Sequence, residues 1–144
     1  VNGEVRVKVE QKRPIARVAS DDVFYIDEGG FRMPLSSQHS ARVPLAYGIV
    51  DEADLETVYK VALTVYKDSF LKTYVTEIHQ NENKEISLKL RLLDFEVLVG
   101  TLDNLEIKLQ NLKAFYQKAK KDTMLDVYKS VNLQFENQVV CTKK

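Results

Sequence analysis

Two histidines and one cysteine are the residues of this chain that could hold a metal ion or act in covalent catalysis. His39 lies in a polar segment and His79 in an expected strand, and neither has a third ligand type at a spacing typical of zinc sites. Cys141 follows Val139 and Val140, and it would need a nearby base and an electropositive setting to act as a nucleophile. A small packed hydrophobe is the simpler interpretation. We therefore predict no metal, no cofactor and no catalytic residue, and a hydrolase using Cys141 or His39 is the alternative that we favour least.

Three other patterns could mark a binding site, and each has a simpler structural interpretation. The pair Gly29-Gly30 lacks the spacing of a glycine-rich phosphate loop, so we predict a turn there rather than a nucleotide site. The acidic residues in segments 21–22 and 51–54 fit a turn and the start of a helix. The basic stretch 113–121 is typical of a solvated helix face, and contact with a membrane or a partner is the alternative.

The bulk composition narrows the class of protein. With 144 residues the chain is long enough for one domain whose core needs no disulfides or metals. Its 21 basic and 21 acidic residues give a formal net charge of zero, so no chain-wide argument favours nucleic acid as a partner. A single cysteine excludes an internal disulfide, and no apolar run approaches the roughly 18–20 residues of a membrane-spanning helix. The chain begins with Val1 rather than methionine, so we expect it to be a piece of a longer protein.

Two stretches have the three- and four-residue apolar spacing of helices that pack on one side. The first begins at Asp51, whose side chain can cap it, and its apolar stripe runs from Leu55 to Phe70. The second has Thr101 as its expected cap and ends near Lys121, because lysines suit the negative end of a helix dipole.

The remaining apolar segments alternate with polar residues or are short and bounded by turns, as strands are. The sum is an α+β fold: a mostly antiparallel β-sheet with two helices packed on it. The expected strands cover residues 5–11, 15–20, 23–26, 31–35, 42–47, 74–80, 85–92, 95–99, 131–136 and 139–142. The expected core consists of Leu55, Val58, Ala62, Val65, Leu88, Leu90, Val97, Val99, Leu105, Leu109, Leu112, Val131 and Leu133.

The C-terminal end of the chain has the features of a sheet edge that a partner covers. Val139, Val140 and Cys141 carry no charge, and the first charge after them is Lys143. An edge strand exposes unpaired N–H and C=O groups, which proteins usually protect with charges or prolines. An apolar edge is expected where a partner adds a strand and satisfies those groups. The alternatives are that this strand lies inside the sheet, or that further residues follow Lys144.

Five segments, in their order along the chain, together carry a resemblance to a known family. They are the strand joint around residues 13–17 (RPIAR), the hairpin 21–33 (DDVFYIDEGGFRM), the strand 43–48 (VPLAYG), the strand 95–100 (FEVLVG) before a leucine-rich helix, and the C-terminal strands 128–141. In this order they resemble the bacterial cell-division family FtsQ/DivIB, at the junction of its POTRA and β domains and through the β domain.

The resemblance implies a division of the chain and a cellular role. Residues 1–13 would be the last strand of a truncated POTRA domain, and residues 14–144 would be the β domain of the family. The full-length protein would be anchored in the cell inner membrane by one N-terminal helix absent from this sequence, with this domain in the periplasm. It would be a non-enzymatic scaffold of the divisome that links early and late components in septation.

The resemblance also implies the partners and the residues that bind them. In the FtsQ/DivIB family the C-terminal strand receives a strand from the division protein FtsB, which pairs with FtsL. Gln134 and Phe135 stand where the family has an Arg-Tyr pair, so the aromatic ring is kept and the charge is lost. The family's aromatic residue near the end has no equivalent, because Val140-Cys141 stands there. The expected partner-binding residues are Gln134, Phe135, Glu136, Asn137, Gln138, Val139, Val140, Cys141 and Thr142.

An open sheet edge next to a POTRA-like strand also suits a protein of another class. The alternative function is an envelope transport or chaperone-like module that binds extended peptides at the edge. Such a protein would bind many peptides weakly, whereas a division scaffold would bind one partner specifically.

Overall fold

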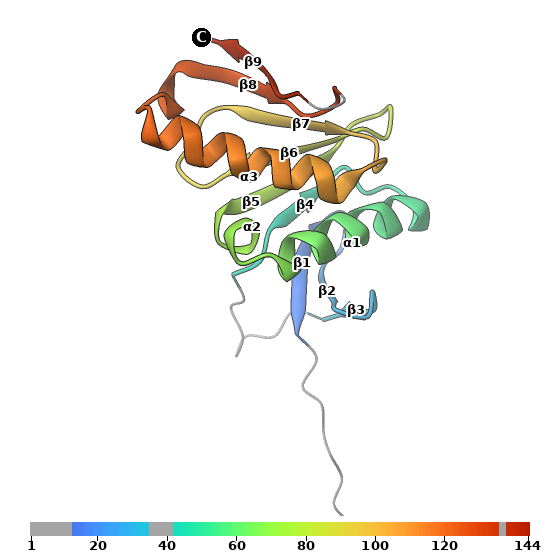
Figure 1. Ribbon diagram of the computed structural model, residues 1–144. Coiled ribbons are helices and arrows are strands. Elements are labelled where there is room, and N and C mark those ends of the chain that lie inside the picture. Colours follow the sequence, from blue (N-terminus) through green and yellow to red (C-terminus); the bar gives the residue numbers. More distant parts are fainter. Residues whose placement is uncertain (1–12, 35–41, 136–137) are drawn as a thin grey trace, which may run out of the picture.

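The computed structural model describes residues 13–34, 42–135 and 138–144, which form one sheet with helices on one of its faces (Figure 1). Nine strands lie in the order β3-β2-β1-β4-β5-β6-β7-β8-β9, and five of their eight pairings are antiparallel. The predicted α+β class with a mostly antiparallel sheet is confirmed, and the three parallel pairings make the sheet mixed. The expected strand over residues 5–11 lies outside the described residues. The strands are β1 (Pro14–Ala19), β2 (Val23–Asp27), β3 (Arg32–Met33), β4 (Leu45–Tyr47), β5 (Val75–Gln80), β6 (Ile86–Leu90), β7 (Glu96–Gly100), β8 (Tyr128–Asn132) and β9 (Val140–Lys143).

Two of the parallel pairings explain why the helices share one face of the sheet. The connection from β4 to β5 contains α1 (Glu52–Lys67) and α2 (Ser69–Tyr74), and that from β7 to β8 contains α3 (Leu105–Lys121) and the 3-10 helix η1 (Leu125–Val127). Crossovers between parallel strands are right-handed in nearly all proteins, and both connections step the same way along the sheet. The helices therefore cover the same face (Figure 1). Among the described residues, every helix is too short or too polar to cross a lipid bilayer.

The first helix ends earlier than its apolar stripe predicts. Asp51 caps α1 as expected, but α1 stops at Lys67, so the predicted continuation to Phe70 is wrong. Asp68 causes the break, because its Oδ1 accepts hydrogen bonds from the backbone N–H groups of Phe70 and Leu71 at 2.9 and 3.1 Å. These bonds start a new helix, α2, instead of continuing α1.

The predicted cap of the second long helix, Thr101, is wrong. α3 begins at Leu105 after Asn104, which has a left-handed φ of 56° and makes no side-chain cap bond. The Thr101 hydroxyl lies 3.3 Å from the Asp103 carboxylate instead. Lys108 donates to the Thr101 carbonyl at 2.8 Å, so this carbonyl is satisfied without a helix around it. The predicted end of the helix near position 121 is confirmed.

The strand before the C-terminal loop is displaced from the predicted 131–136. Asn132 Oδ1 accepts a hydrogen bond from the backbone N–H of Gln134 at 2.9 Å, and such a local bond turns the chain out of the ladder. At the other end the Tyr128 ring packs edge-on against Phe115, with ring centroids 5.2 Å apart. The aromatic contact brings β8 into the ladder three residues earlier than the apolar alternation predicts.

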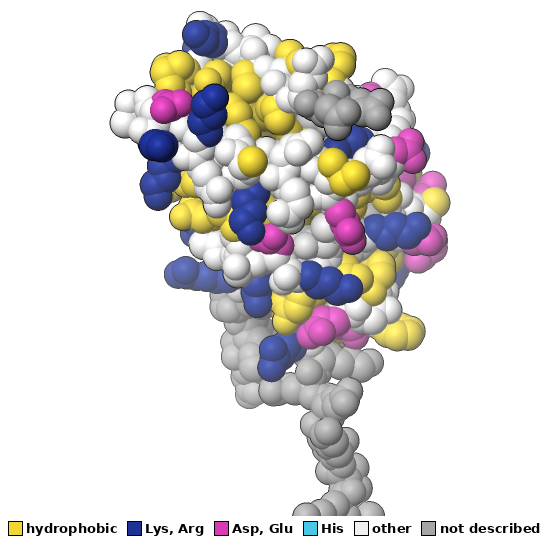
Figure 2. All heavy atoms as spheres, in the orientation of Figure 1, with side chains coloured by type: hydrophobic (Ala, Val, Ile, Leu, Met, Phe, Trp, Pro, Cys, Tyr) yellow, Lys and Arg dark blue, Asp and Glu magenta, His cyan; other side chains and the backbone are white. Residues whose placement is uncertain are grey.

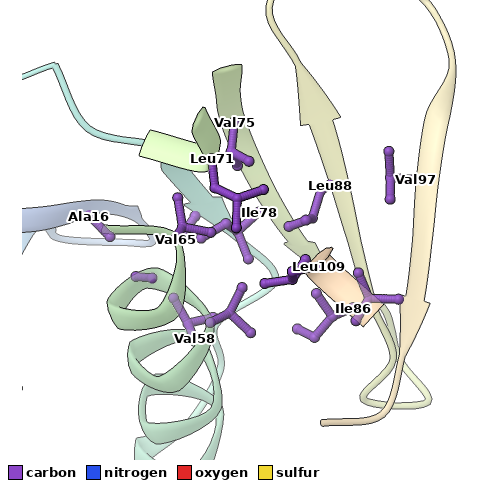
Figure 3. Packing of buried hydrophobic residues seen from close by; sticks show 14 of the residues in the cluster. Ala16, Val58, Val65, Leu71, Val75, Ile78, Ile86, Leu88, Val97 and Leu109 are labelled. Carbon is purple, nitrogen blue, oxygen red and sulfur yellow. The ribbon is translucent and has the colours of Figure 1, made fainter. Parts of the chain in front are cut away.

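The core lies between the sheet and the helices (Figure 3). Val58 and Val65 of α1 and Leu109 of α3 point toward Ile78 of β5 and Leu88 of β6. Every core residue expected from the sequence is buried. The structure adds Ile15, Ala16, Val18, Ile26, Ile78, Ile86 and Phe95 to the fully or nearly fully buried side chains.

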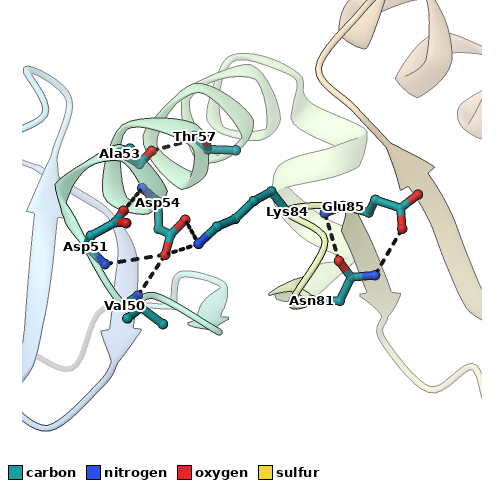
Figure 4. A network of polar contacts seen from close by, with 8 residues as sticks. All are labelled: Val50, Asp51, Ala53, Asp54, Thr57, Asn81, Lys84 and Glu85. Atoms are coloured by element: carbon teal, nitrogen blue, oxygen red, sulfur yellow. Dashed lines mark hydrogen bonds and ion pairs between the residues drawn. The ribbon is translucent and has the colours of Figure 1, made fainter.

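A polar network joins the start of α1 to the turn between β5 and β6 (Figure 4). The Asp54 side chain is only 2% exposed, and its carboxylate accepts hydrogen bonds from Lys84 Nζ at 2.8 Å and from the backbone N–H of Val50 at 2.9 Å. The Lys84 ammonium and the Val50 N–H hold the pKa of Asp54 below its ordinary value. The acidic segment 51–54 is thus engaged in the helix start, as the sequence suggested.

Candidate partner-binding edge

β9 is the last strand of the sheet, and β8 is its one neighbouring strand among the described residues (Figure 1). The two strands are antiparallel, with Cys141 opposite Val131 and Val140 opposite Asn132. The strand runs one residue later at both ends than the predicted 139–142. We call Phe135 and residues 138–143 the β9 edge.

One hydrogen bond beyond β9 fixes which of its backbone groups face outward. The N–H of Lys144 donates to the Val127 carbonyl at 2.9 Å, so the backbone groups of Lys144 face β8. Successive residues of a strand in an antiparallel pair direct their backbone groups to opposite sides. Thr142 therefore also faces β8, and the N–H and C=O groups of Cys141 and Lys143 point away from the sheet.

A second hydrogen bond, on the other side of β8, gives the same alternation. The N–H of Leu133 donates to the Leu98 carbonyl of β7 at 2.9 Å. The backbone groups of Asn132 then point to the opposite side, toward Val140 of β9. Val140 faces inward by this argument, and the N–H of Val139 before it faces outward.

The side chains beside these backbone groups are mostly apolar on both faces of the sheet. Val139 and Cys141 are half-buried and pack against the core. Val140 is 39% exposed, and it lies beside Asn132 and then Leu98 across the neighbouring strands. An added strand would therefore meet apolar surface next to the unpaired backbone.

The loop that leads into β9 carries an exposed aromatic ring. Phe135 is 48% exposed, and its carbonyl accepts a hydrogen bond from the N–H of Gln138 at 3.4 Å. Glu136 and Asn137, which the sequence placed in the site, lie outside the described residues. The backbone of Phe135 therefore lies close to Gln138, two residues before β9 begins, and its ring is partly exposed there.

Gln134 lies at the end of β7 rather than along β9. A Cβ atom built on Gly100 would come within 2.5 Å of Gln134 Oε1, so the absence of a side chain at Gly100 lets this amide approach. Gly100 also has a φ of +75°, which glycine adopts at little cost. Phe135 and residues 138–142 thus lie at the C-terminal end of the sheet, whereas Gln134 lies against the end of β7.

Of the candidate catalytic residues, the structure describes Cys141 and His79. Burial raises the pKa of the Cys141 thiol above its ordinary value, which disfavours the thiolate that a nucleophile needs. His79 stacks on Tyr47 with ring centroids 4.8 Å apart, and its Nε2 lies 3.5 Å from Glu77 Oε1. In residues 13–34, 42–135 and 138–144 no three His, Cys, Asp or Glu side chains gather into a possible metal site, and His39 lies outside these ranges.

Lys143, the last residue of β9, was not expected in the site. Lys143 presents its backbone outward, and Lys144 forms an exposed ion pair with Asp94 at 3.5 Å. The sequence does not indicate which backbone groups face outward at this end of β9, because their direction depends on a bulge in β8. The register passes from Ser130 opposite Thr142 to Tyr128 opposite Lys143, so β8 contains one extra residue there.

The comparison with known families covers almost the whole chain. The family model described as "FtsQ/DivIB, C-terminal related" matches residues 13–142, a range that includes the expected binding residues 134–142. No curated protein sequence matches the chain.

Proposed function

The chain belongs to the FtsQ/DivIB C-terminal related family, and on that premise we propose that it binds FtsB-like and FtsL-like division proteins by strand addition at the β9 edge. The family consists of cell-division proteins that act as scaffolds rather than enzymes. The observation that carries the proposal is that every second residue of β9 directs its backbone N–H and C=O groups away from the sheet. Cys141 and Lys143, with Val139 before them, direct donors and acceptors away from the sheet.

The proposal includes where this scaffold works. Residues 14–144 are the extracytoplasmic β domain in the periplasm, and residues 1–13 are the end of a POTRA domain. The full-length protein is anchored in the inner membrane by an N-terminal helix that precedes this sequence. These statements rest on the family, whose members are membrane-anchored division proteins with a periplasmic domain.

The binding free energy comes from two kinds of contact. A partner strand pairs with the outward N–H and C=O groups, each hydrogen bond contributing about 0.5–1.5 kcal/mol net. Val140 and Phe135, exposed by 39% and 48%, supply apolar surface that the partner removes from water. Specificity follows from which side chains of the partner fit beside these two residues.

The test is a calorimetric titration of this chain with the soluble segment of the same organism's FtsB-like protein, alone and paired with its FtsL-like partner. We expect saturable one-to-one binding that Val139→Pro weakens by about two- to tenfold, because proline removes one outward N–H. Val139→Ala is the matched control, since it shortens the side chain but keeps the N–H, and it should bind more tightly than the proline variant. Equal affinities of the two folded variants would count against strand addition.

The same open edge supports the second candidate, an envelope module that holds extended peptides. Its partner strand would pair through backbone groups alone, so sequence would matter little. Titration with the FtsB-like segment and with a scrambled version of it separates the two functions. Similar affinities for both peptides would favour the peptide-holding module.

A further inference from the structure

We propose that this domain has a second docking site, a basic hollow at the start of β4 and β5 that binds an acidic peptide segment of a protein partner. The basic hollow has a volume of ≈ 710 Å³, within the roughly 300–1,000 Å³ that is usual for ligand pockets. Its lining includes Arg42, Lys72 and Arg91 at the rim and Val43, Leu45 and Val75 as apolar surface.

The three cations of the basic hollow have no carboxylate to neutralise them among the described residues. None of them forms an ion pair there, and no acidic residue lines the hollow. Lys72 Nζ lies over the Tyr66 ring at 4.3 Å from its centroid, and Arg91 Nε donates to the Thr73 carbonyl at 3.2 Å. Neutral partners thus hold two of the cations in place and leave the positive charge uncompensated.

The charge of the basic hollow is a local feature, because the whole chain has a formal net charge of zero. Figure 2 shows Lys and Arg side chains spread along the left side of the helix-bearing face, where Figure 1 places α2 and the end of α3. Like charges that share a concave site repel one another, and a negatively charged ligand relieves the repulsion. Charge complementarity therefore specifies an anionic occupant.

The shape of the hollow favours a peptide over a membrane surface. The half-buried Val43 and Leu45 give the hollow its apolar surface, and Val75, which also lines it, is only 3% exposed. A recess with apolar lining and a cationic rim accepts one apolar side chain flanked by carboxylates, whereas a flat layer of lipid headgroups would meet only the rim. An acidic segment with an apolar residue near its middle fits both features.

The basic hollow is distinct from the β9 edge. It lies at β4 and β5, and β5 is four strands from β9 in the sheet. At about 4.8 Å between strands this separates the two sites by roughly 20 Å. Both can be occupied at once, so one partner or complex that reaches both would gain from the high effective concentration of its second contact.

The test is a fluorescence titration with a labelled peptide of glutamates around a single central leucine, with glutamine replacing every glutamate in the control peptide. We expect saturable binding of the acidic peptide only, weakening as salt rises. The double variant Lys72→Gln/Arg91→Gln should weaken it by about tenfold. The matched control Lys118→Gln/Lys120→Gln removes the same charge from the exposed end of α3 and should bind like the wild type.

Further results distinguish the acidic-peptide site from strand addition at the β9 edge and from binding to a membrane. Val139→Pro alters the β9 edge alone and should leave the acidic peptide bound, so the two sites fail independently. If Lys72→Gln/Arg91→Gln reduces the helical circular dichroism, the single variant Lys72→Glu replaces it. Equal loss in both double variants would overturn the proposal, as would absence of saturable binding. Binding of phosphatidylglycerol vesicles that depends on Lys72 and Arg91, without binding of the peptide, would also overturn it.

Discussion

Replacing Phe135 with alanine tests whether the exposed ring of the β9 edge contributes to partner binding. Phe135 is 48% exposed, and a phenylalanine side chain has roughly 200 Å² to bury, so about 100 Å² remains for a partner to cover. At about 25 cal/mol per Å² full coverage contributes about 2.5 kcal/mol, and half coverage about 1.2 kcal/mol. Since 1.4 kcal/mol is a tenfold change, Phe135→Ala should raise Kd by between about sevenfold and sixtyfold.

The assay is the calorimetric titration with the FtsB-like segment, with thermal unfolding measured by circular dichroism. The chain offers a matched control in Phe31, which is 66% exposed and lies next to β3 at the opposite edge of the sheet. Phe31→Ala makes the same chemical change and should leave Kd unchanged. The reasoning is refuted if Phe135→Ala binds as tightly as the wild type while folded, or if Phe31→Ala weakens binding as much.

Three further predictions follow from the described contacts. Thr142→Pro removes an N–H that faces β8, so it should lower the free energy of unfolding of the free domain by about 1 kcal/mol in urea unfolding. Lys143→Pro removes an outward N–H and should weaken only the partner complex. Lys143→Gln is its control for the loss of charge. The pKa of Asp54 is lowered in the folded state, so its ionised carboxylate stabilises the fold above its ordinary pKa, and this stabilisation is lost as the pH falls through the folded pKa. Asp54→Asn should therefore make the free energy of unfolding fall less steeply below about pH 4. Glu106→Gln, at an exposed position, should leave that pH dependence unchanged. Gly100→Ala should cost about 1–2 kcal/mol from its φ of +75° plus a clash with Gln134, and adding Gln134→Ala should relieve the clash but not the backbone cost.

The apolar periodicity was sufficient to predict the layers of this fold. Leu55, Val58 and Leu109 recur at helical spacing, and their burial against the sheet follows directly from that pattern. A local sequence pattern does not determine which strands pair with each other over long distances along the chain. The parallel pairing of β4 with β5 and of β7 with β8 depends on how the helical crossovers return, so the mixed sheet could not be deduced from alternation alone.

Side-chain hydrogen bonds to nearby backbone caused the main boundary errors. Asp68 and Asn132 each offer a carbonyl or carboxylate oxygen to an N–H two residues later, ending one element or starting another. An Asp within the apolar stripe of a helix indicates such a break from the sequence alone. Asn132 gives no such indication, because apolar and polar residues alternate on both sides of it. Local propensity therefore predicts the elements better than it predicts their ends.

The candidate site was predictable as a position but not in its atomic details. Uncharged residues at 139–141 indicated an edge strand, and β9 lies at the edge. Which amides face outward depends on the bulge in β8 and on the bond from Lys144 to Val127. Arg42, Lys72 and Arg91 come from separate segments, so only the folded sheet and helices bring them to one hollow.

Amide hydrogen exchange on β9, measured by NMR with and without the FtsB-like segment, tests strand addition most directly. The account predicts that the N–H groups of Cys141 and Lys143 exchange rapidly in the free domain and become protected in the complex. The N–H of Thr142, which faces β8, should be protected in both. Saturable binding that leaves the Cys141 and Lys143 amides unprotected would contradict strand addition at this edge.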